Sequence, residues 1–257
     1  SSQVGAYPTH PQIAPMSSVH PGRPLNLDDA EGCAQLREVF LRAGYLPENI
    51  QRLLRIHDQR PLPVLDTAVC LRRLRDDSAL ATLVRLFQLR DSVQEDTARA
   101  ALHPLEPARL QSMGLLDLNS GEASAPFTIA PFEDLLFVSG WMPSHPSAMP
   151  ANWVTGINPT SVLLAQITIR RPVQTALDMG TGAGVHALLA ARHARHVVAT
   201  DISQRALNVT SFNALLNGVA NVECRQGSFY EAVDGETFDC LTTNPPFVIS
   251  PDRRYIY

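Results

Sequence analysis

A segment of this chain that reads as a strand, residues 238–243, ends in a polar amide, two prolines and an aromatic residue: Asn244, Pro245, Pro246 and Phe247. Proline lacks a backbone N–H and its ring fixes φ, so two prolines end a strand and hold the following turn rigid. The Asn244 side-chain oxygen and the Pro245 carbonyl can then both accept hydrogen bonds from one planar NH2 group. Phe247 can stack against a flat amide or base. These four residues are the expected catalytic group, and they favour an amine or carboxamide nitrogen over a hydroxyl.

A second group of candidate residues lies about 60 residues earlier, within residues 175–201. The order there is apolar strand, glycine turn, helix and second strand, which is one βαβ unit. Glycines in the turn let a ligand approach backbone that carries no Cβ, and a helix N-terminus attracts carboxylate or phosphate. Asp201 ends the second strand, where its carboxylate can accept both hydroxyls of a ribose.

The glycine spacing distinguishes this turn from a dinucleotide site. It is GxGxG, whereas dinucleotide sites carry GxGxxG, and no third glycine is in register for a pyrophosphate. The turn therefore predicts a single adenosine-type cofactor. The residues of this unit expected to contact it are Asp178, Gly180, Thr181, Gly182, Gly184, Asp201 and Ile202.

A GxGxG turn followed about 60 residues later by a strand ending in NPPF resembles the amino-methylating class I S-adenosylmethionine-dependent methyltransferases. Within that superfamily, residues 152–257 are most similar to the release-factor glutamine methyltransferases and to RNA base N-methyltransferases. The resemblance implies a Rossmann-like α/β domain that binds S-adenosyl-L-methionine and needs no metal. It also implies that Asn244 contacts the cofactor as well as the acceptor.

Two further segments acquire expected roles from this resemblance. Ser228 and Phe229 follow the third strand, where related enzymes contact the adenine. Ser228 replaces the more common Asp, and Phe229 suits either the adenine or the core. Thr160 and Ser161 open the helix before the glycine turn, a segment that folds over the methionine end of the cofactor in similar enzymes. They could bind its carboxylate, although N-capping accounts for them equally well.

The N-terminal half is expected to be mostly helical, after a proline-rich arm. Asn26 or Asp28 can cap a first helix that ends near Ala43. Further helices are predicted at residues 48–57, 64–75, 80–87, 93–102 and 106–113. Strands are predicted at residues 115–118 and 127–129, around a turn at 119–122, and a strand-like segment at 131–141.

The last three of these helices and the strands after them resemble a winged helix. A DNA-binding version would carry basic side chains on its third helix. That helix offers only Arg109 against Glu106. Packing on the catalytic core, or docking of a protein substrate, is therefore favoured over the reading of DNA.

These elements predict four segments. They are a disordered arm at residues 1–24, a helical, winged-helix-like domain at 25–141, a linker at 142–151, and the N-terminal part of a Rossmann-like methyltransferase domain at 152–257. The related fold needs about three more strands, each with its helix. We therefore expect the natural protein to continue past Tyr257, and the strand ending at Thr243 to lack a partner on one side.

Composition limits the class of protein. A net charge of −4, with 45% hydrophobic and 18% charged residues, is typical of a soluble globular protein and indicates neither nucleic acid nor membrane as a partner. No apolar run approaches the roughly 20 residues that span a bilayer. The four scattered cysteines read as reduced thiols, so we expect a cytoplasmic protein.

The sequence thus favours an S-adenosylmethionine-dependent N-methyltransferase whose acceptor is a protein glutamine, on a partner such as a translation factor. Two alternatives stay open. The acceptor could be an exocyclic amine of an RNA or DNA base, because Arg253 and Arg254 just past the motif could meet phosphate. The chain could instead be a cofactor-sensing winged-helix DNA-binding regulator without turnover, although an intact NPPF motif argues against this.

Overall fold

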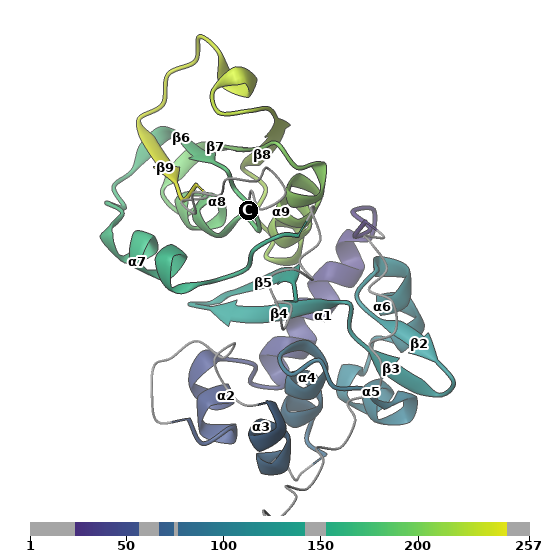
Figure 1. The fold of residues 1–257 in the computed structure, drawn as a ribbon. Helices are drawn as coiled ribbons and strands as arrows, with labels where there is room; N and C mark the ends of the chain where they lie inside the picture. Colours follow the sequence, from purple (N-terminus) through teal and green to yellow (C-terminus); the bar gives the residue numbers. More distant parts are fainter. Residues whose placement is uncertain (1–23, 57–66, 75–76, 142–152, 246–257) are drawn as a thin grey trace, which may run out of the picture.

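The computed structural model describes residues 24–56, 67–74, 77–141 and 153–245. A mostly helical N-terminal half and an α/β C-terminal half lie on either side of a hairpin, formed by β4 (Phe127–Phe132) and β5 (Leu135–Gly140) (Figure 1). The predicted linker, and the predicted arm up to residue 23, lie outside the described residues. Within those residues, no helix is both long and apolar enough to cross a membrane.

Amphipathic helices build the N-terminal half around one core. Leu83, Val84 and Phe87 are fully buried, as the helical spacing of apolar residues predicts for this segment. Phe40 packs edge-on against Tyr45 with ring centroids 4.6 Å apart, and Phe87 lies against the same Phe40. The helices of this half are α1 (Ala30–Arg42), α2 (Pro47–Leu53), α3 (Thr67–Arg73), α4 (Ala79–Phe87), α5 (Glu95–Leu102) and α6 (Pro107–Met113).

The N-cap of α1 differs from the prediction. Asp29, and not Asn26 or Asp28, caps the helix by accepting a hydrogen bond of 2.9 Å from the Gly32 N–H. Arg109 of α6 donates to both Asp29 carboxylate oxygens, at 2.8 and 2.7 Å. This partner lies 80 residues away along the chain, so local sequence gave no reason to prefer Asp29. Arg109 is thus engaged within the protein.

The short strands of the N-terminal half also differ from the prediction. The turn is shorter than the predicted 119–122, since Ser120 and Gly121 alone form it, with φ of 52° and 82°. Residues 127–129 do not pair across this turn, because they belong to the β4–β5 hairpin. Positive φ at both central residues suits a two-residue hairpin turn. The predicted helix at 93–102 starts two residues late, because its first residues pair with a strand. The sheet has the order β1-β3-β2 and consists of β1 (Val93–Gln94), β2 (Asp117–Asn119) and β3 (Glu122–Ser124).

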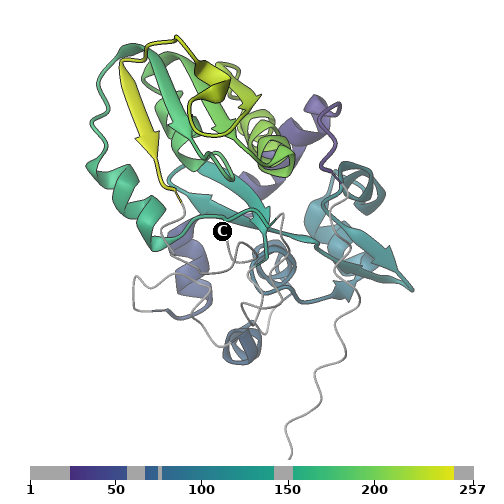
Figure 2. The same cartoon turned by 45° about the horizontal axis from the view of Figure 1, so that its top comes forward.

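The C-terminal half contains a parallel sheet in the order β8-β7-β6-β9. β9 lies at the outer edge, where β6 is its only partner among the described strands (Figure 2). The parallel strands and their crossover helices confirm the expected Rossmann-like α/β fold. The elements are α7 (Pro159–Ile167), β6 (Val173–Met179), α8 (Val185–Ala190), β7 (Ala194–Asp201), α9 (Gln204–Leu216), β8 (Val222–Gln226), the 3-10 turn η3 (Glu231–Val233) and β9 (Cys240–Thr243).

Strand β5 lies between two hydrophobic cores, because both of its faces are buried. Leu136 and Val138 belong to the core of the N-terminal half, which also takes in Phe212 of α9. Phe137 belongs to the core on one face of the parallel sheet, together with Val197 of β7. Helix α1 packs on α9 as well (Figure 1). The two halves are therefore joined by shared packing.

Candidate functional site

The carboxyl ends of three parallel strands bring the main candidate residues together. β6 lies between β7 and β9 in the sheet. The glycine turn that follows β6 is therefore flanked by Asp201 at the end of β7 and by Asn244 just after β9. Ligands of open α/β sheets bind outside the carboxyl ends of the strands.

The glycine turn is held in a conformation that favours glycine. Gly180, Gly182 and Gly184 have φ of 72°, 56° and 80°. A Cβ on Gly180 would meet nothing within 4 Å, and one on Gly182 would meet only the Thr155 carbonyl oxygen, at 3.7 Å. A Cβ on Gly184 would lie 2.8 Å from Thr210 Cγ2. The first two glycines thus border open space, whereas the third makes room for α9.

Asp201 is tied to this turn by its side chain. Its Oδ2 accepts a hydrogen bond of 3.0 Å from the Gly182 N–H, and its Oδ1 accepts one of 2.9 Å from the Ser203 N–H. Asp201 is only half-buried. Because each carboxylate oxygen can accept more than one hydrogen bond, the group keeps acceptor capacity for a ligand beside the turn.

Asp178 and Thr181 support the turn from beneath. Asp178 is 1% exposed, and its Oδ2 accepts hydrogen bonds from Thr181 Oγ1 at 2.7 Å and from the Ala187 N–H at 3.0 Å. Burial raises the pKa of Asp178, and these donors act against that rise. The structure therefore places Asp178 inside the protein, under the turn, and not on its open side.

His186 is a further residue of this region that the sequence analysis did not single out. It lies in the first turn of α8, is buried, and interacts electrostatically with Asp178. Burial lowers the pKa of its imidazole, and its Nε2 has no hydrogen-bond partner among the described residues. The signal available in the sequence was a histidine two residues after the glycine turn. It was easily missed, because the residues around it are ordinary helix formers.

Two apolar side chains are exposed next to the strand ends. Ile202 follows β7 and is 65% exposed, and Phe229 follows β8 and is 69% exposed. The core role considered for Phe229 is therefore wrong. The Ser228 backbone N–H donates to Glu231 Oε2 at 3.1 Å, and the Ser228 hydroxyl takes no part in this hydrogen bond. Exposed apolar groups on adjacent strand ends suit the faces of a flat ring.

Asn244 is held by the helix that precedes the glycine turn. Its Nδ2 donates to Thr160 Oγ1 at 3.3 Å, and that hydroxyl donates to Asn158 Oδ1 at 2.6 Å. Asn158 and Ser161 form the capping box of α7, so the Ser161 hydroxyl serves the cap. Pro245 is exposed, whereas Pro246 and Phe247 lie outside the described residues.

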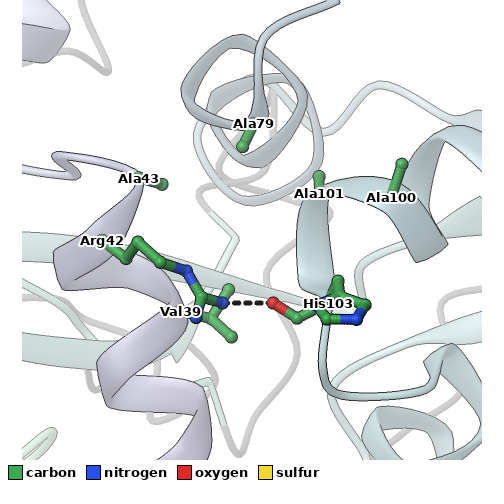
Figure 3. A pocket seen from close by; sticks show the side chains of 7 residues that line it. All are labelled: Val39, Arg42, Ala43, Ala79, Ala100, Ala101 and His103. Carbon is green, nitrogen blue, oxygen red and sulfur yellow. Dashed lines mark hydrogen bonds between the residues drawn. The ribbon is translucent and has the colours of Figure 1, made fainter.

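A hollow of about 410 Å³ lies elsewhere, among the helices of the N-terminal half (Figure 3). The Arg42 guanidinium donates to the His103 carbonyl oxygen across it. None of the predicted site residues lines this hollow, so it is separate from the strand ends. Its lining consists of Val39, Arg42, Ala43, Ala79, Ala100, Ala101 and His103.

Comparison with protein families assigns the two halves separately. Residues 155–255 match the methyltransferase small domain, and residues 42–126 match a domain of unknown function, DUF7059. The β4–β5 hairpin lies between the two matched segments. The C-terminal match agrees with the Rossmann-like fold and with the glycine turn described above.

Curated relatives match only part of the chain. A release factor glutamine methyltransferase of Xylella fastidiosa is 43% identical over 77 residues, which are 29% of this chain and 28% of that protein. One of Cereibacter sphaeroides is 40% identical over 92 residues, 35% of this chain and 33% of that protein. A solved ribosomal protein L11 methylase of Lactobacillus delbrueckii is 33% identical and covers 32% of this chain and 43% of that one, with a TM-score of 0.29. The chain thus spans about a third of the length of the curated relatives it matches.

Proposed function

We propose that the protein is an S-adenosylmethionine-dependent N-methyltransferase whose acceptor is the carboxamide of a protein glutamine. The observation that carries the proposal is the position of Asn244 at the end of β9, the strand next to β6, whose end leads into the glycine turn. The match of residues 155–255 to the methyltransferase small domain supports the same reaction class. Relatives named release factor glutamine methyltransferases favour a protein acceptor, with a translation factor as the first candidate.

The residues at the strand ends fit S-adenosylmethionine. Gly180 and Gly182 leave space next to the backbone, which a bulkier residue would fill. Asp201 has acceptor capacity for two ribose hydroxyls. Ile202 and Phe229 offer exposed apolar surface for the adenine. Such a combination of apolar walls with a few directed polar groups is typical of a cofactor site.

When bound there, S-adenosylmethionine would supply a methyl group carried on a sulfonium. The protein then has to align the two reactants, and good alignment can lower the activation barrier of a reaction by up to about 7–11 kcal/mol. Asn244 and the Pro245 carbonyl accept hydrogen bonds from the acceptor NH2 and aim its nitrogen at the methyl carbon. Thr160 fixes the Asn244 side chain from α7.

The pairing of two arginines on α5 and α6 favours protein over nucleic acid as acceptor. Arg109, the one basic residue expected on a DNA-reading helix, is bound to Asp29 and also donates to Gln35 Oε1 at 2.9 Å. Arg99 on the preceding helix is likewise paired, with Glu95 at 2.8 Å. Cations that are already paired attract phosphate less.

The proposal is tested by transfer of labelled methyl from S-adenosylmethionine into fractionated cell protein and RNA. We expect label in protein, at a glutamine side-chain nitrogen identified by mass spectrometry, and transfer slowed by about a hundredfold or more with Asn244→Ala. Label in RNA would replace the acceptor with a nucleobase. Cofactor binding by calorimetry without any transfer, together with a shifted DNA band in gels, would favour the regulator instead.

A further inference from the structure

Helix α9 contacts the glycine turn through two fully buried polar side chains. Thr210 Oγ1 donates to the Gly182 carbonyl oxygen at 3.0 Å, and Asn213 Nδ2 donates to the Ala183 carbonyl oxygen at 2.8 Å. The two residues are three apart, so they lie on the same face of the helix. The carbonyls of the turn are therefore fixed from outside the turn.

Asn213 also binds the hairpin of the N-terminal half. Its Oδ1 accepts a hydrogen bond of 2.8 Å from the Val138 N–H, and its Nδ2 donates to the Val138 carbonyl oxygen at 2.9 Å. Both amide hydrogens and the amide oxygen are thereby used, in a site with no solvent exposure. A buried amide with this many partners has one arrangement that satisfies it.

Asn217, one helical turn later, makes the same contact with the hairpin and none with the glycine turn. Its Oδ1 accepts from the Leu136 N–H at 2.9 Å, and its Nδ2 donates to the Leu136 carbonyl oxygen at 2.7 Å. The remaining amide hydrogen goes to the Asn213 carbonyl oxygen in the same helix, at 2.8 Å. Asn217 is therefore a natural control for Asn213.

The hairpin is itself firmly placed. The Ile129 carbonyl oxygen of β4 accepts from the buried Tyr45 hydroxyl at 2.8 Å and from Gln88 Nε2 at 2.6 Å. At the tip, Glu133 pairs with Arg170 at 3.0 Å and also with Arg192. A movement of the hairpin would have to break contacts to both halves.

We infer that Asn213 is a positioning residue through which the β4–β5 hairpin of the N-terminal half holds the cofactor turn in its binding conformation. The inference deepens the proposed function, and it rests on that function only for the identity of the ligand. The hairpin lies outside the segment that matches the methyltransferase small domain, yet it fixes the turn of that segment. By linkage, a ligand on the turn must stabilise the hairpin as much as the hairpin favours the ligand.

The test compares Asn213→Ala with Asn217→Ala in the full chain, by amide hydrogen exchange and by calorimetry with S-adenosylhomocysteine. Both variants should exchange faster in β5. Only Asn213→Ala should exchange faster in residues 180–188, and only it should lose affinity, by about five- to tenfold. With saturating cofactor, its turnover should recover, which an effect on chemistry would not allow. Equal effects of the two variants on the turn would overturn the inference.

A measurement on the unmodified protein covers the case in which Asn213→Ala does not fold. Saturating S-adenosylhomocysteine should slow exchange of the Leu136 and Val138 amides, and unchanged exchange there would overturn the coupling. Thr210→Val, which keeps the shape but removes the hydroxyl, should loosen the turn without affecting β5. If the unmodified protein does not bind the ligand, the proposed function fails, while exchange of residues 180–188 in the two alanine variants still decides the role of Asn213.

Discussion

The two sides of the candidate site are held to different degrees. On the cofactor side, the glycine turn is fixed from several directions, by Asp201, by Thr210 and by Asn213. On the proposed acceptor side, the Asn244 side chain makes one hydrogen bond within the described part of the chain, of 3.3 Å, to Thr160. β9 carries it at the edge of the sheet, with β6 as its only partner among the described strands.

This difference in rigidity predicts that the two sides contribute to different quantities, cofactor affinity and turnover. A preformed turn needs little ordering when it binds a ligand, so it favours affinity for the cofactor. A single long hydrogen bond to Thr160 orients the Asn244 amide but lets it adjust to an acceptor nitrogen. We therefore expect changes on the cofactor side to alter affinity, and changes on the acceptor side to alter turnover.

Asn244→Ala tests the acceptor side and should have the largest effect. It removes the acceptor that orients the nitrogen, so turnover should fall by about a hundredfold or more. S-adenosylmethionine affinity should change little, as calorimetry on the same preparation would show. Asn244→Asp keeps an oxygen and should be milder. Near-normal turnover in the alanine variant would make the NPPF turn structural and remove the main support for a nitrogen acceptor.

Asp201→Ala tests the cofactor side and should act on affinity. The ribose hydroxyls lose a charged acceptor, so S-adenosylmethionine should bind about ten- to a hundredfold more weakly. Part of this loss comes through the turn, because the Gly182 N–H loses its partner as well. Asp201→Asn keeps a neutral oxygen, so its affinity should lie between those of the unmodified protein and of Asp201→Ala. Unchanged affinity in calorimetry would refute the assignment.

Thr160→Val tests whether α7 positions Asn244. Valine keeps the shape of threonine but removes the hydroxyl, so turnover should fall about two- to fivefold, the value of one ordinary hydrogen bond. The same hydroxyl also donates to Asn158, the N-cap of α7, so the substitution could weaken the helix itself. The melting temperature of the variant controls for this loss of stability. Unchanged turnover would show that Asn244 is oriented without Thr160.

The Asp29–Arg109 pair gives a pH dependence that should leave both sides of the site alone. The Arg109 hydrogen bonds lower the pKa of Asp29 from its ordinary value of 3.8. A lowered carboxyl pKa stabilises the fold above the unfolded value, and this stability is lost as pH falls through the folded pKa. Urea unfolding between pH 5 and pH 3 should show a smaller acid loss in Asp29→Asn, which keeps the cap. Equal slopes would contradict this.

Local patterns predicted the βαβ unit and the position of Asp201 beside the glycine turn. The glycine spacing and the carboxylate after the second strand lie within one βαβ unit, so their geometry follows from neighbouring residues. The bond between Asn244 and Thr160 joins residues 84 apart, and the contact of Asn213 with Val138 joins residues 75 apart. Such pairs depend on how whole elements pack, which no local pattern encodes.

The same reason explains the errors in the N-terminal half. Asp29 and its neighbours all suit an N-cap by residue type, and only the distant Arg109 distinguishes Asp29. Val93 and Gln94 suit a helix start as well as a strand, and pairing with β3 decides for the strand. In both places, tertiary contacts chose between locally equivalent options.

The two tryptophans of the chain lie where the halves meet. Trp153 Nε1 donates to the Trp141 carbonyl oxygen at 2.9 Å, and Trp141 Nε1 donates to the Ala125 carbonyl oxygen at 2.9 Å. Indole emission depends on the polarity and hydrogen bonding around the ring. The tryptophan fluorescence of this chain therefore comes from the junction, and rearrangement of the halves can be followed in real time without attaching a dye.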